Sequence, residues 1–383
     1  MICITNRLSY ITGRSSRGCA IFTPGMNRKN HIKPFYLISF LVVLIACINE
    51  PQPAAPAIAI RAADLSFAPE IMAAGTRFYD NNGRQRPLLE IMQRAGCNTV
   101  RLRLWHSRYV PHSGLDEVQA FSEQVKAMGM KVFLDIHYSD TWADPGKQRK
   151  PAAWKYLSGQ LLQDSVYNYT RKVLAAIRPD IVQIGNELNN GFLWPDGHID
   201  NPEAFIALLK AGIAAARATD PDMQVLIHFA GYNGATGFYK LLHDNEVDYD
   251  LIGLSYYPVW HGKDLTALRG VIQRLYNDHR KPVILAEIAY PFSLGWNDQT
   301  QNIVGLTSQL LPDYPATPAG QQAYLQRLLD LLSETEGGLG FCYWAPEWVA
   351  FKGPAATDGS TWENQTLFDF NNKALPAMAV FKE

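Results

Sequence analysis

Glu187 and Glu287 are the side chains whose type and placement best suit bond-breaking chemistry. Each follows a short run of apolar residues, in the segments IVQIGNE and VILAEIA. Retaining glycosidases use two such carboxyls about 5 to 5.5 Å apart, one protonating the leaving oxygen and one attacking the anomeric carbon. The sequence shows no metal-ligand cluster and no Ser or Cys nucleophile motif that would compete with this interpretation. A salt-bridged surface glutamate is the alternative for either residue alone, but a pair favours catalysis.

The two carboxyl groups can act together only if the strands that they follow place them near each other in the folded chain. From Ile60 onward, short apolar runs alternate with amphipathic segments such as 87–95, 115–128 and 202–219. We predict eight strands: Asp64–Phe67, Thr99–Trp105, Val132–Tyr138, Ile181–Glu187, Val225–Phe229, Leu251–Tyr257, Val283–Ala289 and Gly340–Trp344. Eight strand-helix units over about 250 to 320 residues predict an α/β fold of the (β/α)₈ TIM-barrel type, in one catalytic domain. A doubly wound open sheet is the alternative, although no glycine-rich phosphate loop follows the first strand.

In a (β/α)₈ barrel, the functional site lies at the carboxyl ends of the strands. Asn186, beside Glu187, is placed there to donate to a sugar 2-hydroxyl. In VRLRLW, period-two alternation puts Arg101 and Arg103 on one face, which we expect to be the barrel interior. Buried arginines need carboxylate partners, and we expect Arg101 to keep Glu287 ionised. The alternative is an arginine pair exposed outside the barrel.

The positions of the tryptophans indicate a sugar polymer. Flat rings gathered on one rim suit the apolar faces of sugar rings held across several subsites, so Trp142, Trp260 and Trp344 are candidate substrate-binding residues. Only Trp154 and Trp362 fall elsewhere in this prediction. Seven of the 9 tryptophans lie at or shortly after predicted strand ends: Trp105, Trp142, Trp194, Trp260, Trp296, Trp344 and Trp348.

The amino-terminal segment predicts export. An apolar run, Phe35–Ala46, follows three basic residues. It is too short to span a bilayer as a helix, but it has the length and the basic flank of a signal peptide. It ends in LIAC, which resembles the lipobox of bacterial lipoproteins and predicts acylation of Cys47. An ordinary secretory signal that ends in Cys is the alternative.

The domain organisation follows from this segment. Met26 lies at the usual distance before the basic cluster, so residues 1–46 are expected to be a mis-started leader plus a lipoprotein signal peptide. Residues 47–60 are rich in Pro and Ala and predict a tether, and 61–383 predict the barrel domain. We therefore expect export across the inner membrane and attachment through lipid alone, at the periplasmic or the cell-surface face of the outer membrane.

Composition excludes several classes of protein. The 383 residues are 47% hydrophobic and carry 35 Lys+Arg against 36 Asp+Glu. The combination of high apolar content and near-zero net charge excludes a disordered chain and a collagen-like fibre. It also provides no net positive charge that would attract nucleic acid. Cys97 and Cys342 alone follow the lipobox, too few for a disulfide framework. We expect a monomer.

Several long stretches resemble the endo-β-1,4-galactanases, or arabinogalactan endo-β-1,4-galactanases, of glycoside hydrolase family 53, a retaining group in a large clan of (β/α)₈ glycosidases. The resemblance implies that Glu187 is the acid/base, Glu287 the nucleophile and Asn186 the 2-hydroxyl contact, acting on galactan side chains of pectin. It further implies that the subsite of the cleaved bond is lined by Arg101, His137, Asp140, Tyr256 and Trp344. The matching stretches are DLSFAPEIMAAGTRFYD, NTVRLRLW, LDIHYSDTWADPGKQRKPAAW, IVQIGNELNNGFLWP, DLIGLSYYPVWHG, AEIAYPF and YWAPEW.

Calcium is a further expectation from the resemblance. Some bacterial members of this family bind it between the loops after strands seven and eight. SLGWNDQTQN here lacks a dense run of oxygen ligands, but Asp298, Asn302 and Asp358 are candidates for a structural ion. The reaction itself requires no cofactor. Two other functions stay open: another retaining β-glycanase of the same clan, and a non-catalytic, lipid-anchored galactan-binding protein.

Overall fold

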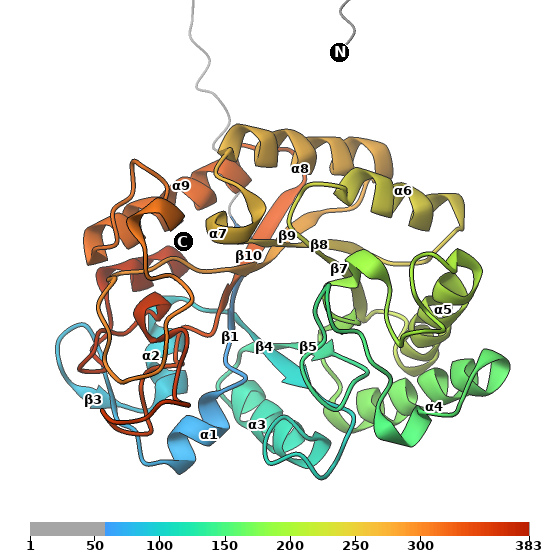
Figure 1. Cartoon of the computed structure of the whole chain (residues 1–383), viewed down its shortest axis with the longest axis horizontal. Coiled ribbons are helices and arrows are strands. Elements are labelled where there is room, and N and C mark those ends of the chain that lie inside the picture. Colours follow the sequence, from blue (N-terminus) through green and yellow to red (C-terminus); the bar gives the residue numbers. More distant parts are fainter. Residues whose placement is uncertain (1–57, 383) are drawn as a thin grey trace, which may run out of the picture. The chain divides into compact units, whose positions relative to one another are not determined.

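The structure is a computed structural model that describes residues 58–382. Eight parallel strands close into a barrel in the order β1-β10-β9-β8-β7-β6-β5-β4, and helices form a ring outside them (Figure 1). The predicted (β/α)₈ barrel is therefore confirmed. Its strands are β1 (Ile60–Asp64), β4 (Thr99–Leu104), β5 (Lys131–Ile136), β6 (Ile181–Ile184), β7 (Gln224–Ala230), β8 (Leu251–Tyr256), β9 (Val283–Ile288) and β10 (Gly338–Trp344).

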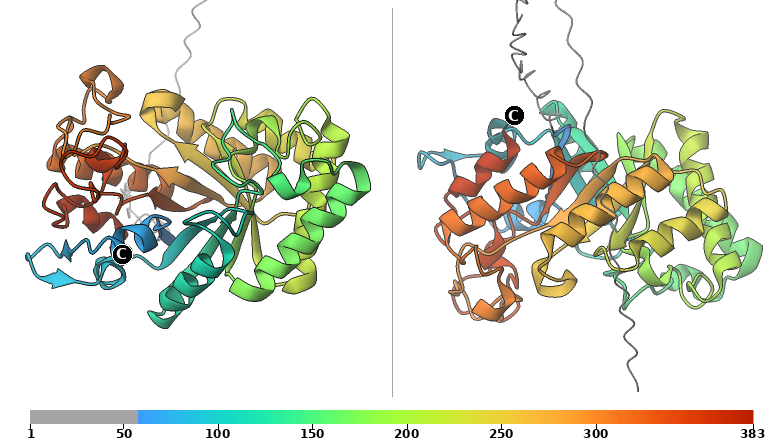
Figure 2. Two further views of the ribbon diagram at one scale, coloured as in Figure 1. Left: turned by 60° about the horizontal axis from the view of Figure 1, so that its bottom comes forward. Right: turned by 90° about the horizontal axis from the view of Figure 1, so that it is seen from above.

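Helices cover the barrel on all sides, as two other views show (Figure 2). Within 58–382, none of them is long and apolar enough to cross a membrane. Glycines end two helices as predicted, because Gly96 and Gly129 have positive φ values of 102° and 76°. The helices are α1 (Ala68–Ala73), α2 (Leu88–Ala95), α3 (Leu115–Ala127), α4 (Gly159–Ile177), α5 (Pro202–Thr219), α6 (Ala235–Asp244), α7 (Pro258–His261), α8 (Leu265–His279) and α9 (Pro318–Ser333).

The first strand lies earlier than predicted. We expected Asp64–Phe67, but β1 runs from Ile60 to Asp64, so Ile60 belongs to the barrel and not to the tether. Residues 65–67 instead turn into α1, whose first turn contains a proline, and the Ser66 N–H donates to Asp64 Oδ1 at 3.0 Å. A small hairpin that the sequence did not predict, β2 (Phe78–Tyr79) with β3 (Gln85–Arg86), follows α1.

The barrel interior is divided into an apolar floor and a polar upper layer. The floor consists of buried side chains from the strand starts: Ile60, Ala62, Phe133, Ile181, Leu226, Leu251, Ile284 and Cys342. Nearer the carboxyl ends of the barrel strands, the inward positions are polar and also buried: Asp64, Arg101, Asp135, Gln183, His228 and Glu287. Because all strands are parallel, this polar layer lies at the carboxyl-terminal mouth of the barrel.

Candidate active site

A tight turn after β6 presents Asn186 and Glu187 to the mouth. Gly185 has a φ of 80°, and a Cβ added there would lie 2.6 Å from the Leu188 side chain, so the turn requires glycine. Glu187 itself has a φ of 47°, which a residue with a side chain rarely adopts. The Gly-Asn-Glu order is thus needed to aim both polar side chains inward.

Glu287 lies on β9 opposite Ser255 of β8, where the register between the two strands shifts. Its Oε1 is 2.9 Å from Arg101 Nη2, which is the contact that alternation in VRLRLW predicts. Its Oε2 accepts a hydrogen bond from the Tyr257 hydroxyl at 2.9 Å. The cation of Arg101 and the hydroxyl donor of Tyr257 therefore both stabilise the ionised form of Glu287.

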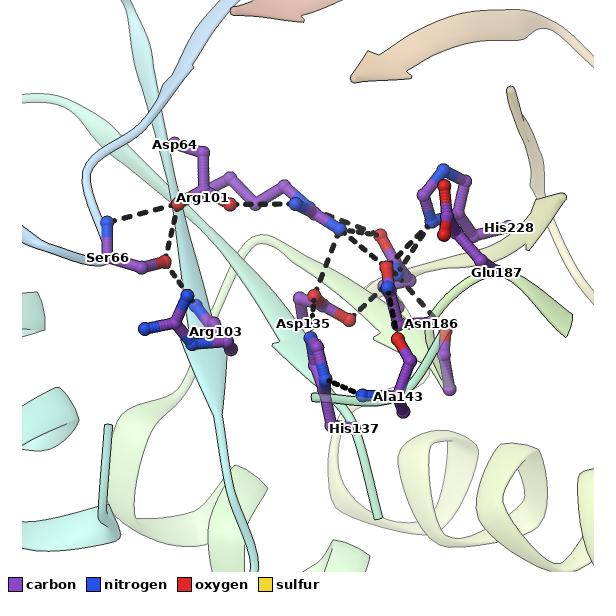
Figure 3. Close-up of polar contacts among 12 residues, drawn as sticks. Asp64, Ser66, Arg101, Arg103, Asp135, His137, Ala143, Asn186, Glu187 and His228 are labelled. Carbon is purple, nitrogen blue, oxygen red and sulfur yellow. Dashed lines mark hydrogen bonds and ion pairs between the residues drawn. The ribbon is translucent and has the colours of Figure 1, made fainter. Parts of the chain in front are cut away.

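Arg101 organises the polar layer (Figure 3). Its guanidinium donates to Asp64 at 2.7 Å and to Asp135 at 2.9 Å, in addition to its ion pair with Glu287. It also donates to Asn186 Oδ1 at 3.0 Å. One buried cation thus holds three carboxylates and the amide beside Glu187 in a single geometry, which preorganises the site.

The carboxyl groups of the two glutamates lie close enough together to act on the same glycosidic bond. A carboxylate oxygen of Glu187 lies within 4.8 Å of one of Glu287, which fits a retaining pair and is too close for the about 6.5 to 9.5 Å of inverting enzymes. Burial raises the pKa of Glu187 to about 7 and that of Glu287 to about 8, and Arg101 opposes the rise at both, so the two carboxyls hold one proton between them near neutral pH. Because Arg101 pairs with Glu287, we place the single proton of the pair on Glu187.

A cavity of about 690 Å³ lies over the two glutamates. Its walls are strongly aromatic, and Trp260 stacks on Trp362 with ring centroids 6.1 Å apart. Trp362 had been assigned away from the site, and that prediction is wrong because the long loop after β10 returns to the mouth. Trp105, Trp194 and Trp296 do not line this cavity, although they were predicted on its rim. The tryptophans that do line it are Trp142, Trp260, Trp344, Trp348 and Trp362.

His137 lines the cavity, whereas Asp140 does not. The His137 Nδ1 accepts from the Ala143 N–H at 3.1 Å, so its Nε2 carries the proton and donates to Asp135 at 2.9 Å. Asp140 instead accepts from the Ala152 N–H at 2.7 Å. Its carboxylate therefore orders the loop after β5 rather than the sugar site, contrary to the expectation from the resemblance.

Tyr257, and not Tyr256, lies in the site. Tyr256 is fully buried and its hydroxyl donates to the Gly262 carbonyl at 3.0 Å, away from the cavity. Tyr257 lines the cavity and contacts Glu287. Alternation from the inward-facing Leu251 would have identified the correct tyrosine, since residues 251, 253, 255 and 257 share one face of the strand.

Arg103 is buried in the barrel interior as predicted, but it does not have the carboxylate partner that we expected. Among residues 58–382, its guanidinium forms no ion pair and lies over the Trp142 ring at 4.0 Å and the Phe67 ring at 4.7 Å. It also donates to Ser113 Oγ at 3.0 Å. Burial lowers the pKa of Arg103 to about 10, so it stays charged at neutral pH. Cation–π contacts therefore replace the ion pair and hold Trp142 at the cavity wall.

Replacing Tyr257 with phenylalanine is expected to lower kcat by about 10- to 100-fold, because the hydroxyl that donates to Glu287 is lost where charge changes during the reaction. The measurement is kcat on galactan, with the melting temperature recorded beside it. Tyr256→Phe is the matched control, since the one hydrogen bond of its hydroxyl within residues 58–382 is to a backbone carbonyl; a larger loss in this control would contradict the assignment.

A second group of polar side chains lies between the loops after β9 and β10. Asp298 Oδ2, Asn302 Oδ1 and Glu363 Oε2 are buried and have no hydrogen-bond partner within residues 58–382. Asn302 Nδ2 is 3.4 Å from Glu363 Oε1, so the two loops meet here. Unsatisfied buried oxygens of this type are the ligands that calcium prefers, and these residues fit such an ion. Asp358 does not belong to the group because its exposed carboxylate pairs with Lys352 at 3.1 Å. Glu363 was not predicted from the sequence.

A closed (β/α)₈ barrel with two opposed glutamates under an aromatic cavity at its carboxyl-terminal mouth defines a glycoside hydrolase. The model of glycosyl hydrolase family 53 matches residues 60–381, which contain the whole barrel. The chain belongs to this family.

Named relatives and a solved structure agree with the family. An arabinogalactan endo-β-1,4-galactanase of Cellvibrio japonicus is 38% identical over 339 residues, which cover 84% of this chain and 89% of the relative. An endo-β-1,4-galactanase of Bacillus subtilis is 32% identical over 84% of this chain and 85% of its own length. The family 53 catalytic domain of Ignisphaera aggregans superposes with a TM-score of 0.82 at 38% identity, covering 87% of this chain and 98% of that domain.

Proposed function

We propose that this protein hydrolyses β-1,4-galactosidic bonds within galactan or arabinogalactan chains of pectin, by double displacement with retention. The observation that carries the proposal is the pair Glu187 and Glu287, with oxygens within 4.8 Å of each other in the cavity. The galactanase activities for which the Cellvibrio japonicus and Bacillus subtilis relatives are named support galactan as the substrate. Several tryptophans around one open cavity support a polymer bound across subsites, which suits internal cleavage.

The site residues have defined tasks in this reaction. Glu287 attacks the anomeric carbon while Glu187 donates its proton to the leaving oxygen, which gives a covalent galactosyl-enzyme. Glu187 then takes a proton from water, which attacks the same carbon and releases the sugar. One N–H of the Asn186 amide donates to the Ala143 carbonyl at 2.8 Å, and the other has no partner in the described part of the chain and can donate to the sugar 2-hydroxyl.

Product analysis tests the proposal. Potato galactan is expected to yield oligosaccharides from internal cleavage, and proton NMR at early times should show the β-anomer at each new reducing end. Faster cleavage of mannan or glucan would support another retaining β-glycanase of the clan. Binding of galactan without release of reducing ends would support a carbohydrate-binding protein, and an initial α-anomer would overturn the double displacement.

We further propose that the protein acts as a monomer attached to the outer membrane through lipid on Cys47. This cysteine lies outside the described residues, so the support is the LIAC motif that follows the apolar run, and the Pro- and Ala-rich segment up to β1. Wild-type protein should incorporate radiolabelled palmitate and accumulate as a precursor with globomycin. Cys47→Ala should lose the label and leave the membrane fraction; labelling of that variant would overturn the proposal.

Calcium is proposed as a structural ion held by Asp298, Asn302 and Glu363. Since binding stabilises only the folded state, EDTA is expected to lower the melting temperature by about 5 °C, and calcium should restore it. Asp298→Asn should melt lower and no longer respond to EDTA. Asp358→Asn is the matched control because its carboxylate is exposed and paired with Lys352. An unchanged response in Asp298→Asn would exclude this site.

A further inference from the structure

A buried glutamine behind the acid/base has no task in the reaction described so far. Gln148 lies in the loop after β5, is 1% exposed and does not line the cavity. Its Nε2 donates to the Asn186 carbonyl at 2.7 Å and to the Glu187 carbonyl at 3.2 Å. A side-chain amide has two N–H groups, so both can be used on the backbone of these two neighbouring residues.

These two hydrogen bonds begin where the ladder between the barrel strands ends. The Gly185 N–H still donates to the last residue of β5 at 3.1 Å, and Asn186 and Glu187 follow outside the strand. Glu187 has φ 47° and ψ 63°, a left-handed conformation that persists only when the surroundings fix it. The two carbonyls that Gln148 binds belong to the peptide groups on either side of the Glu187 Cα. Holding both peptide groups fixes φ and ψ of the residue between them.

Gln148 is itself held against the turn after β6. Its own carbonyl accepts from the Trp194 N–H at 2.6 Å. Nearby in the same two loops, Asn190 Nδ2 donates to the Pro145 carbonyl at 2.9 Å. The loop after β5 is thus tied to several points of the segment 186–194, and the Gln148 amide has a fixed base from which to hold Glu187.

The Glu187 carboxyl depends on its backbone more than the Asn186 amide does. Asn186 Oδ1 accepts from Arg101 Nη2 and from Gln183 Nε2, each at 3.0 Å. The one hydrogen bond of the Glu187 carboxyl within residues 58–382 is to Ser255 Oγ, at 2.6 Å. A rotation of the peptide groups would therefore displace the Glu187 carboxyl, while the Asn186 amide would keep its partners.

We propose that Gln148 is a positioning residue, which fixes the backbone of Glu187 through both flanking peptide groups and thereby aims the acid/base carboxyl at the leaving oxygen. Because Gln148 does not line the cavity, its effect is on proton transfer and not on the binding of sugar. The proposal rests on the proposed function, in which Glu187 is the acid/base.

Gln148→Met tests the proposal, because methionine has a similar length and volume but no donor. On galactan, kcat is expected to fall about 10- to 100-fold with KM within about twofold, since a misaligned acid loses part of its contribution. For a dinitrophenyl β-galactobioside, kcat/KM should fall less than about threefold, because that leaving group departs without a proton. Gln148→Asn, whose amide is one methylene shorter, should show a smaller loss of the same kind and replaces the methionine variant if that variant does not fold.

A double variant and a matched control complete the test. In the Glu187→Gln background, Gln148→Met should cost less than about threefold more on galactan, because it acts through a group already removed. Gln321→Met is the control, since the Gln321 amide also donates to two backbone carbonyls, those of Tyr290 at 2.8 Å and Thr366 at 2.9 Å, from α9 outside the barrel. It should lower the melting temperature and leave the ratio of the activities on the two substrates at the wild-type value.

Three results would overturn the role of Gln148: equal losses of Gln148→Met on the two substrates, an unchanged kcat on galactan, or the full loss repeated in the Glu187→Gln background. If Glu187→Gln itself lost activity equally on both substrates, the acid/base assignment would be wrong instead.

Discussion

Glu287→Ala is expected to lower kcat on galactan by about five orders of magnitude, because no other group among the described residues is placed to form the covalent intermediate. The Glu287 carboxylate is held by Arg101 and Tyr257, each at 2.9 Å, and water in the vacated space would lack that orientation. Galactan binding should persist because the aromatic walls of the cavity are unchanged.

Azide provides the decisive measurement for this variant. It fits the space of the missing carboxylate and should restore cleavage of an activated aryl galactobioside, giving an α-galactosyl azide because attack comes from the face that Glu287 occupies. Glu287→Gln, which keeps the side-chain volume, serves as the companion variant for folding. Turnover within about 100-fold of wild type in either variant would show that Glu287 is not the nucleophile.

Glu187→Gln is expected to lower kcat on galactan by about 10³- to 10⁴-fold, which is the usual contribution of a general acid. Formation of the intermediate from a dinitrophenyl galactobioside should be nearly normal, because that leaving group departs without a proton. Its hydrolysis should be slow without the base, and azide should accelerate it and yield a β-galactosyl azide.

The pH dependence of kcat/KM tests whether Glu187 is the acid/base. Burial raises the pKa of Glu187 to about 7, so wild-type kcat/KM should fall as the pH rises through about 7 and the acid is lost. The Gln side chain does not titrate, so this basic limb should disappear for the activated substrate. Equal losses on galactan and on the activated substrate would contradict the acid/base assignment.

The barrel and both glutamates were predictable because each depends on local signals. Period-two alternation and the glycines that end helices reflect the backbone of single elements. Parallel strands must place their carboxyl ends at one mouth, so Glu187 and Glu287 converge whatever the loops do. The same alternation predicted Arg101 inside the barrel, and its need for a carboxylate partner predicted the pairing with Glu287.

The errors concern residues whose positions depend on loops or on partners far along the chain. Trp362 reaches the cavity through the loop after β10, and Asp140 turns from the cavity to the Ala152 N–H. Glu363 joins Asp298 from a loop that lies 65 residues later. No periodic pattern encodes such contacts, because the segments involved have no regular backbone.

Sequence by itself determined the repeating architecture, the pair of carboxyls and the family to which the chain belongs, since these depend on residue types in order. Only the tertiary structure decided which oxygen binds which donor. The Arg103 guanidinium lies over the Trp142 ring instead of pairing with the expected carboxylate. Ser255 contacts both Glu187 and His228 through hydrogen bonds. Hydrogen-bond direction and pKa depend on distances of a few ångströms between different strands, and those distances exist only once the barrel has closed.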